Sequence, residues 1–266
     1  MNNNNEGITK SFRKLNLKDF EINSYLSDIA KLRAEEKVFS NHFSKNWSEA
    51  FTASECFYVM ICRSTKLYSD YIKKLSEDTK SEKISTLTAL SNIHTRASQQ
   101  YLEILTLIKN GFPDGAFARG RSMYELSVIA SFITKYGEDT AEKFIEASQS
   151  QDRYEWAMAS NAFPENKRHM TFGDILKLCD MDFDAWKDDY TAANQTVHAS
   201  PQGTFGRLGA PDGVENNSKR SAYGIAAPAI QSANTLALIS SMLFSIFPDD
   251  KTIESMSTVT DWLNEL

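Results

Sequence analysis

Apolar residues recur along most of the chain at spacings of three and four, the period of an amphipathic α-helix. The clearest stripe comprises Leu87, Leu90, His94, Ala97, Tyr101, Ile104 and Ile108. Gly111 then suits a helix-ending left-handed conformation, and Pro113 suits the first turn of a second helix, which is expected to reach about Tyr136. These two helices are expected to form an antiparallel hairpin.

Further helices are predicted on both sides of this hairpin. In chain order they are Ile22–Phe43, Trp47–Ser76, Glu138–Ala162, Thr171–Cys179, Phe183–Ala199 and Ala229–Phe247. The polar stretch Ser76–Lys83 is expected to be a linker or a helix-helix turn. No segment alternates apolar and polar residues with period two, so essentially no β-sheet is expected. The fold class is therefore all-α, a multi-helix bundle of long antiparallel helices.

Three parts are expected along the chain. Residues 1–10 are predicted to be a disordered tail, 11–85 an N-terminal helical pair, and 86–266 the main helical bundle. The helical pair is either a cap or part of the bundle. Ser200–Asn217, with four glycines and two prolines, is expected to be one long irregular loop, and loops of this length are often functional.

Charge and composition exclude several classes of protein. A net charge of -6 argues against non-specific binding of nucleic-acid duplexes, although a local basic groove stays open. Three cysteines without a Cys-x-x-Cys pair favour a reducing compartment, and the first residues lack the pattern of a signal peptide. The apolar run that ends at Phe247 is shorter than the ~20 residues a membrane span needs. A cytoplasmic protein that makes no contact with membranes is expected.

One polar cluster interrupts the apolar pattern of the second hairpin helix. A helical residue advances by ~100°, so Arg121, Ser122 and Glu125 share a face with Ala118, Ile129, Phe132 and Tyr136. Burial of such charges costs several kcal/mol unless they are paired, and Arg before Glu is the weaker order for a surface pair. The cluster therefore either fixes the register of the bundle or lines a polar cavity, with Arg121 as an anion receptor.

Two histidines are further candidates for chemistry. His94 is a lone imidazole in an apolar seam, expected either to be a satisfied core residue or to share a site with Glu125, which lies at a comparable level of the hairpin. His198 follows Asn194 by one turn and precedes the glycine-rich loop, where it can act as an acid/base or as a helix-end residue.

Recognised catalytic patterns do not occur in the sequence. It has no phosphate-binding glycine motif, no His-Glu-x-x-His and no Gly-x-Ser-x-Gly, and the four histidines lack metal-ligand spacing. Neither a metal nor a cofactor is expected.

The run Gly115-Ala-Phe-Ala-Arg-Gly-Arg-Ser-Met-Tyr-Glu125 resembles a bacterial helical family of unknown function, family 5677 of such domains. That family has a helix ending in glycine, then Ala-x-x-Arg-Ser-x-x-Glu, and later a histidine after an aromatic residue. Arg121, Ser122 and Glu125 match the second feature, and Tyr190 with His198 matches the third. The resemblance is expected to extend from about Leu87 to Phe247.

A more distant likeness connects the chain with HEPN ribonucleases, which are helical bundles of toxin and antiphage systems. Their motif is arginine, a polar residue, three others and histidine. Here Asn194 and His198 match, but Ala193 replaces the arginine. The likeness would make His198 the acid/base of a metal-independent nuclease, provided that Arg207 or Arg121 replaces the absent arginine.

Three functional hypotheses follow. The first is a binding or regulatory protein, not an enzyme, whose pocket holds a small polar or anionic ligand; its site residues are Arg121, Ser122, Glu125, His94, Tyr190, Arg207 and His198. The second is a HEPN-like ribonuclease, a homodimer with RNA as substrate and His198 and Asn194 in the active site. The third is a structural bundle that binds a protein partner and has no ligand site.

Overall fold

The computed structural model describes residues 18–150, 153–164, 167, 169–179, 187–198, 201–206 and 220–265. Over these residues the chain forms helices and loops without any strand, which confirms the all-α fold. The chain divides into two compact units, residues 1–48 and 49–266. The predicted tail at 1–10 lies outside the described residues.

The first unit contains one long helix, α2 (Asp19–Asn46). It begins after Lys18, whose backbone N–H donates to the Glu21 carboxylate at 2.7 Å. Near its other end the Phe39 and Phe43 rings stack with their centroids 5.1 Å apart. Most of its other side chains are exposed.

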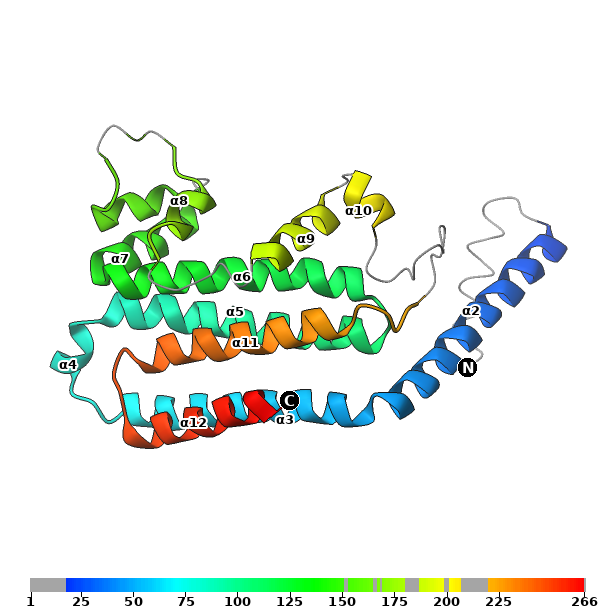
Figure 1. The fold of residues 1–266 in the computed structure, drawn as a ribbon, viewed down its shortest axis with the longest axis horizontal. Coiled ribbons are helices and arrows are strands. Elements are labelled where there is room, and N and C mark those ends of the chain that lie inside the picture. Colours follow the sequence, from blue (N-terminus) through cyan, green and yellow to red (C-terminus); the bar gives the residue numbers. More distant parts are fainter. Residues whose placement is uncertain are drawn as a thin grey trace. The chain divides into compact units, whose positions relative to one another are not determined.

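The second unit is built around three helices that pack against one another: α5 (Ile84–Lys109), α6 (Pro113–Tyr136) and α11 (Ala226–Phe244). They run side by side through the middle of this unit (Figure 1). Gly111, with φ of 76°, makes the turn between α5 and α6, so the predicted hairpin is confirmed. In α11 the buried residues include Leu236, Ile239 and Leu243, as expected for a core helix. None of the described helices is long and apolar enough to cross a membrane.

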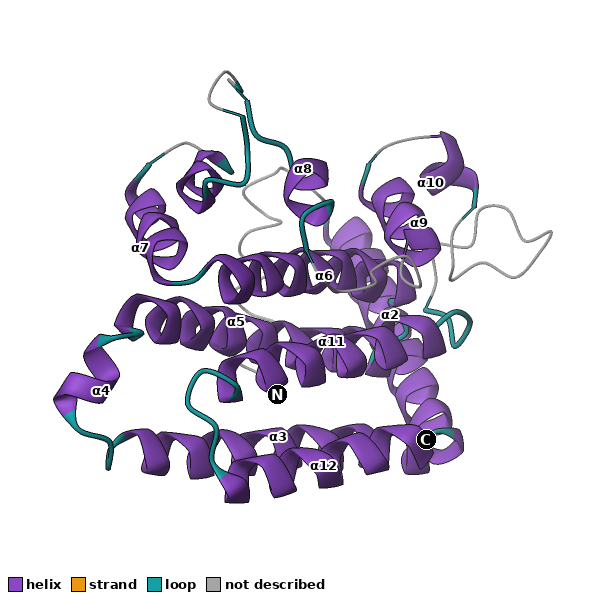
Figure 2. Cartoon of the chain, turned by 60° about the vertical axis from the view of Figure 1, so that its left-hand side comes forward, coloured by secondary structure: helices purple, strands orange, loops and turns teal. Residues whose placement is uncertain are grey.

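A second layer consists of α3 (Ser48–Ile72) and α12 (Asp250–Glu265), which lie side by side (Figure 2). The hydroxyl groups of Ser64 in α3 and Ser255 in α12 are 2.7 Å apart. Aromatic side chains connect this layer to the central helices, since the Tyr68 ring lies 5.0 Å from that of Phe244 in α11. The short helix α4 (Glu77–Ser81) joins α3 to α5, within the stretch predicted to be a linker or turn.

Shorter helices cover the opposite side of α6 (Figure 1). They are α7 (Glu138–Glu146), the 3-10 turns η1 (Ala147–Gln149) and η2 (Glu155–Ser160), α8 (Phe172–Leu176), α9 (Lys187–Val197) and α10 (Pro201–Phe205). The single helix predicted over Glu138–Ala162 is wrong, because the backbone is extended at Ser150. That break lets Trp156 fold back and place its ring 4.9 Å from that of Phe144.

Part of the predicted irregular loop is helical, because Pro201–Phe205 forms α10. Gly203 fits tightly against the end of α9, and a Cβ at this position would collide with the backbone carbonyl of Gln195. Glycine is therefore required there by the close approach of two backbones. Residues 207–217 of the loop, with Arg207, lie outside the described residues.

Candidate functional site

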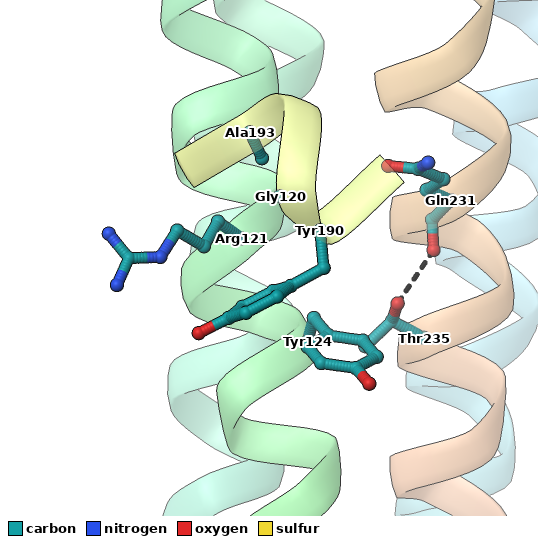
Figure 3. A pocket seen from close by; sticks show the side chains of 7 residues that line it. All are labelled: Gly120, Arg121, Tyr124, Tyr190, Ala193, Gln231 and Thr235. Atoms are coloured by element: carbon teal, nitrogen blue, oxygen red, sulfur yellow. Dashed lines mark hydrogen bonds between the residues drawn. The ribbon is translucent and has the colours of Figure 1, made fainter. Parts of the chain in front are cut away.

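The Arg-Ser-x-x-Glu residues lie where α6 is covered by α9. A small cavity opens here, lined by Gly120, Arg121 and Tyr124 of α6, Tyr190 and Ala193 of α9, and Gln231 and Thr235 of α11 (Figure 3). The rings of Tyr124 and Tyr190 are 4.8 Å apart, and that of Phe172 in α8 lies 5.5 Å from Tyr190. These aromatic contacts hold α8 and α9 against α6.

Four side chains form a polar group that we name the Arg121 cluster: Arg121, Glu125, Tyr190 and Arg153. An Nη2 of Arg121 lies 3.0 Å from Oε1 of Glu125, and the Tyr190 hydroxyl donates to the same oxygen at 3.2 Å. The guanidinium of Arg121 lies over the Tyr190 ring, 5.7 Å from its centroid. Arg153 places an Nη2 3.8 Å from the other oxygen of Glu125.

The surroundings keep Arg121 and Tyr190 in their protonated forms, which pair with the Glu125 carboxylate. Burial disfavours a charged guanidinium, but the hydrogen bond with Tyr190 and the charge of Glu125 outweigh it and raise the pKa of Arg121. Burial is also the main cause that raises the pKa of Tyr190, so its hydroxyl keeps the proton that it donates to Glu125. Two guanidinium groups thus face one carboxylate, and the Arg121 cluster carries an excess of positive charge.

The cluster is half-buried and incompletely paired. The side chains of Arg121 and Glu125 are 19% and 17% exposed, so the pair is neither a free surface pair nor a sealed one. The Nε of Arg121 is buried without a hydrogen-bond partner among the described residues, and so is the Nε2 of Gln231. A buried unpaired N–H costs about 1–3 kcal/mol, so both positions favour an acceptor.

The cavity itself is too small for a metabolite. Its volume of about 10 Å³ accommodates about one water molecule. The two tyrosine rings separate the guanidinium of Arg121 from Gln231 and Thr235, and the guanidinium points away from the cavity (Figure 3). A ligand larger than water would therefore contact Arg121 on its outer, partly exposed side.

The face predicted to carry this cluster into the core lies at the edge of the buried surface around Arg121 and Glu125, although Phe132 on the same face is fully buried. Arg121, Ser122 and Glu125 are all half-buried, as are Ala118 and Ile129. The fully buried side of α6 lies nearly opposite and includes Ala116, Phe117, Gly120, Met123, Tyr124, Ser127, Val128 and Ser131. The expectation that these polar residues occupy core-facing positions was wrong, because the core side of α6 is rich in small residues and shows weakly in the apolar pattern.

The other predicted site residues lie apart from the cluster. Ser122 accepts a hydrogen bond from the Gln100 side chain at 2.9 Å and so belongs to the α5–α6 interface. Asn194 is on α9 and His198 directly follows that helix, but neither lines the cavity, and His198 is exposed. Of the residues proposed for one pocket, Arg121, Glu125 and Tyr190 come together. Arg207 lies outside the described residues.

His94 occupies a separate, buried position between α5 and α11. Its Nε2 lies 3.1 Å from the Ser240 hydroxyl, which itself donates to the Leu236 carbonyl at 2.7 Å. Because that hydroxyl proton is already used, the imidazole must donate through Nε2, which leaves Nδ1 as an acceptor. His94 and Tyr68 also line a second cavity, of about 280 Å³, between α3 and α5. This geometry matches the alternative in which His94 is a core histidine whose hydrogen bonding is satisfied.

Stability is expected to depend on pH through His94. Burial lowers the pKa of His94 to about 4, so the unfolded chain, with the usual value of ~6.5, binds the proton more readily than the folded chain. The free energy of unfolding should fall by about 2 kcal/mol between about pH 7.5 and pH 5 from this residue alone. Urea denaturation at these two pH values in the His94→Gln variant should lack this component, and an unchanged pH dependence would contradict the assignment.

Sequence reasoning missed several residues of the site. Tyr124 lies off the face of the helix that the sequence pattern singled out, and Gln231 and Thr235 come from a helix more than 100 positions along the chain. Arg153 belongs to a segment that was assigned to a continuous helix. The only sequence signals that could have identified Arg153 as a site residue are its charge and its proximity in sequence to aromatic residues. In the part of the chain that the structure describes, no group of three His, Cys, Asp or Glu side chains could hold a metal ion.

Comparison with known proteins gives one result. The model of a family described as a family of unknown function (DUF5677) matches residues 87–177. The match confirms the resemblance to an uncharacterised family and includes Arg121, Ser122 and Glu125. It ends at residue 177, short of the expected Phe247, so Tyr190 and His198 lie outside the matched segment. No curated protein and no solved structure matches the chain.

Proposed function

We propose that this chain is a binding protein that recognises a small anion, or the anionic group of a larger molecule, at the Arg121 cluster. The observation that carries the proposal is the partly exposed outer side of the Arg121 guanidinium, within a cluster that has more positive than negative charge. A carboxylate or a phosphate group matches a guanidinium with two parallel hydrogen bonds, which is the strongest neutralising contact available there.

The pairing with Glu125 would orient the guanidinium before a ligand arrives. Glu125 and the Tyr190 ring hold Arg121 on one side, so little side-chain freedom is lost when an anion binds. Arg153 is 71% exposed and therefore free to turn from Glu125 towards a bound anion. The cluster thus combines one fixed cation with one adaptable cation.

Inorganic phosphate and succinate serve as probes of this proposal. At about ten times the dissociation constant, a bound anion should stabilise the folded chain by about 1.4 kcal/mol, which appears as a rise of the thermal midpoint. The rise should disappear in Arg121→Met. It should persist in the matched control Arg119→Met, because Arg119 lies on the same helix and pairs with Glu103 at 2.8 Å in an exposed contact.

The alternative outcomes separate the remaining hypotheses. If neither anion shifts the midpoint and Arg121→Met is neutral or stabilising, the pair serves only the register of a structural bundle. The ribonuclease hypothesis has less geometric support, because Ala193 is buried against α6 while His198 is exposed. Incubation with RNA and a chelator tests for ribonuclease activity directly. If His198→Ala abolishes the cleavage, the ribonuclease hypothesis would replace the present proposal.

A further inference from the structure

Helix α2 carries a hydrophobic stripe whose middle part is exposed. Seven positions spaced alternately by three and four residues follow one side of the helix: Ile22, Tyr25, Ile29, Leu32, Glu36, Phe39 and Phe43. Six of them are apolar. Spacing of this kind over three heptads is the a and d pattern of a coiled coil.

Burial along the stripe is greatest at its two ends, and Ile29 and Phe39 between them are half-buried. Ile22 and Phe43 are each 2% exposed, whereas Tyr25 is 51% and Leu32 66% exposed. Every residue from Lys31 to Val38 is exposed. A helix gains most of its stability from packing an apolar face, so two turns without burial leave this part of α2 poorly supported.

The charged positions beside the stripe favour a second copy in parallel orientation. With Ile22 at position a, the g positions include Glu21, Asp28 and Glu35, and Arg33 is at position e. In a parallel pair each g residue faces the e residue five positions along the partner, so Asp28 meets Arg33 of the second copy. In an antiparallel pair g faces g, which would bring acidic residues together.

We propose that α2 joins two copies of this chain through a parallel two-stranded coiled coil, with Leu32 at the centre of the interface. Glu36 occupies an a position, where a polar residue lowers the stability of the coil but helps to fix its register. Asp28 makes an exposed contact within its own helix, with Lys31 at 3.0 Å. Such surface pairs contribute about 0–1 kcal/mol, so Asp28 can turn to the partner at little cost.

The test uses the full chain and compares substitutions at two similarly exposed positions of one helix. The native chain should form a dimer of twice its 30.0 kDa mass in light scattering coupled to size-exclusion chromatography. Leu32→Asp should raise the dissociation constant of the dimer at least about a hundredfold, since two leucines are lost from each interface. Val38→Asp is the matched control, because Val38 is 69% exposed but lies off the stripe.

Two further variants keep the proposal falsifiable if Leu32→Asp unfolds α2. Glu36→Leu should strengthen the dimer by removing the polar layer, and this gain cannot result from unfolding. Arg33→Glu should weaken it, and Asp28→Lys added to Arg33→Glu should restore it in the parallel arrangement. A native chain that stays monomeric at every concentration would overturn the proposal. So would a dimer that Leu32→Asp and Val38→Asp affect equally.

Discussion

Replacing Tyr101 with alanine is expected to lower the free energy of unfolding by about 4 kcal/mol, the largest effect of a single substitution that we predict. Tyr101 in α5 is 1% exposed, and its ring meets that of Phe57 in α3 edge to face at 5.4 Å. Its hydroxyl donates to the backbone carbonyl of Ser54, also in α3, at 3.1 Å. Alanine removes all of these contacts and leaves a cavity between the two layers.

The position of Tyr101 makes this loss more serious than that of an average core residue. The backbone of α3 lies apart from those of α5 and α11 (Figure 2), so contacts between the layers depend on long side chains that reach across the space. Tyr101 and the Tyr68–Phe244 pair are the principal aromatic contacts across it. Without Tyr101, α3 and with it α12 lose much of their attachment to the central helices.

Urea denaturation followed by far-ultraviolet circular dichroism measures the effect. Tyr101→Phe keeps the ring and loses only the hydrogen bond to Ser54, so about 1 kcal/mol is expected. Leu102→Ala is the matched control, because Leu102 is the next residue of α5 and is 42% exposed. Similar losses in Leu102→Ala and Tyr101→Ala would show that Tyr101 does not hold the layers together.

The helical architecture could be predicted from the sequence because it depends on local patterns. The stripe from Leu87 to Ile108, the glycine turn and Pro113 identify α5 and α6 with boundaries close to the observed ones. The orientation of α6 about its own axis could not be predicted. Ala116, Gly120, Ser127 and Ser131 make up much of its buried side, and such small residues allow close packing but carry a weak hydrophobic signal.

The relation between His94 and the Arg121 cluster shows a second limit of sequence reasoning. Counting residues from the turn at Gly111 does place His94 and Glu125 at comparable heights along the hairpin. The height of a residue along the hairpin does not determine the direction in which its side chain points. Gln100, six residues or ~240° around α5 from His94, is the residue that contacts α6 through Ser122. His94 faces α11 instead, where it contacts Ser240.

The outer part of the candidate site depends on contacts that are distant in sequence. Tyr190 reaches Glu125 from α9, and Arg153 reaches the same carboxylate from the segment before η2. Both segments were predicted to be helical, but periodicity does not show which helix each one packs against, and their packing relies on a few aromatic residues such as Phe172. Periodicity therefore could not identify the partners of Glu125, and only the family resemblance pointed to Tyr190.

Glu138 is the site of the second large effect, and Glu138→Ala is expected to lower the free energy of unfolding by about 3 kcal/mol. Its carboxylate accepts the backbone N–H groups of Ser85 and Thr86 at 2.6 and 2.9 Å and the Thr86 hydroxyl at 2.8 Å. These donors begin α5, so a residue at the start of α7 caps a helix more than 50 positions earlier. Loss of the carboxylate leaves several of them unpaired, and Thr86 is buried.

The pH dependence of Glu138 provides an independent check. Burial alone would raise the pKa of Glu138, but the hydrogen bonds from Thr86 and Ser85 outweigh it and lower that pKa. The carboxylate therefore stabilises the fold above its unfolded pKa of ~4.3, and this stabilisation is lost as the pH falls through the lower, folded value.

Urea denaturation at neutral pH should separate Glu138→Ala from the matched control Glu142→Ala. Glu142 is an exposed residue of the same helix, so its substitution is expected to change the free energy of unfolding by less than about 0.5 kcal/mol. Equal losses in the two variants would mean that Glu138 does not cap α5, whereas a difference that shrinks towards acid would identify the ionised carboxylate as the cap.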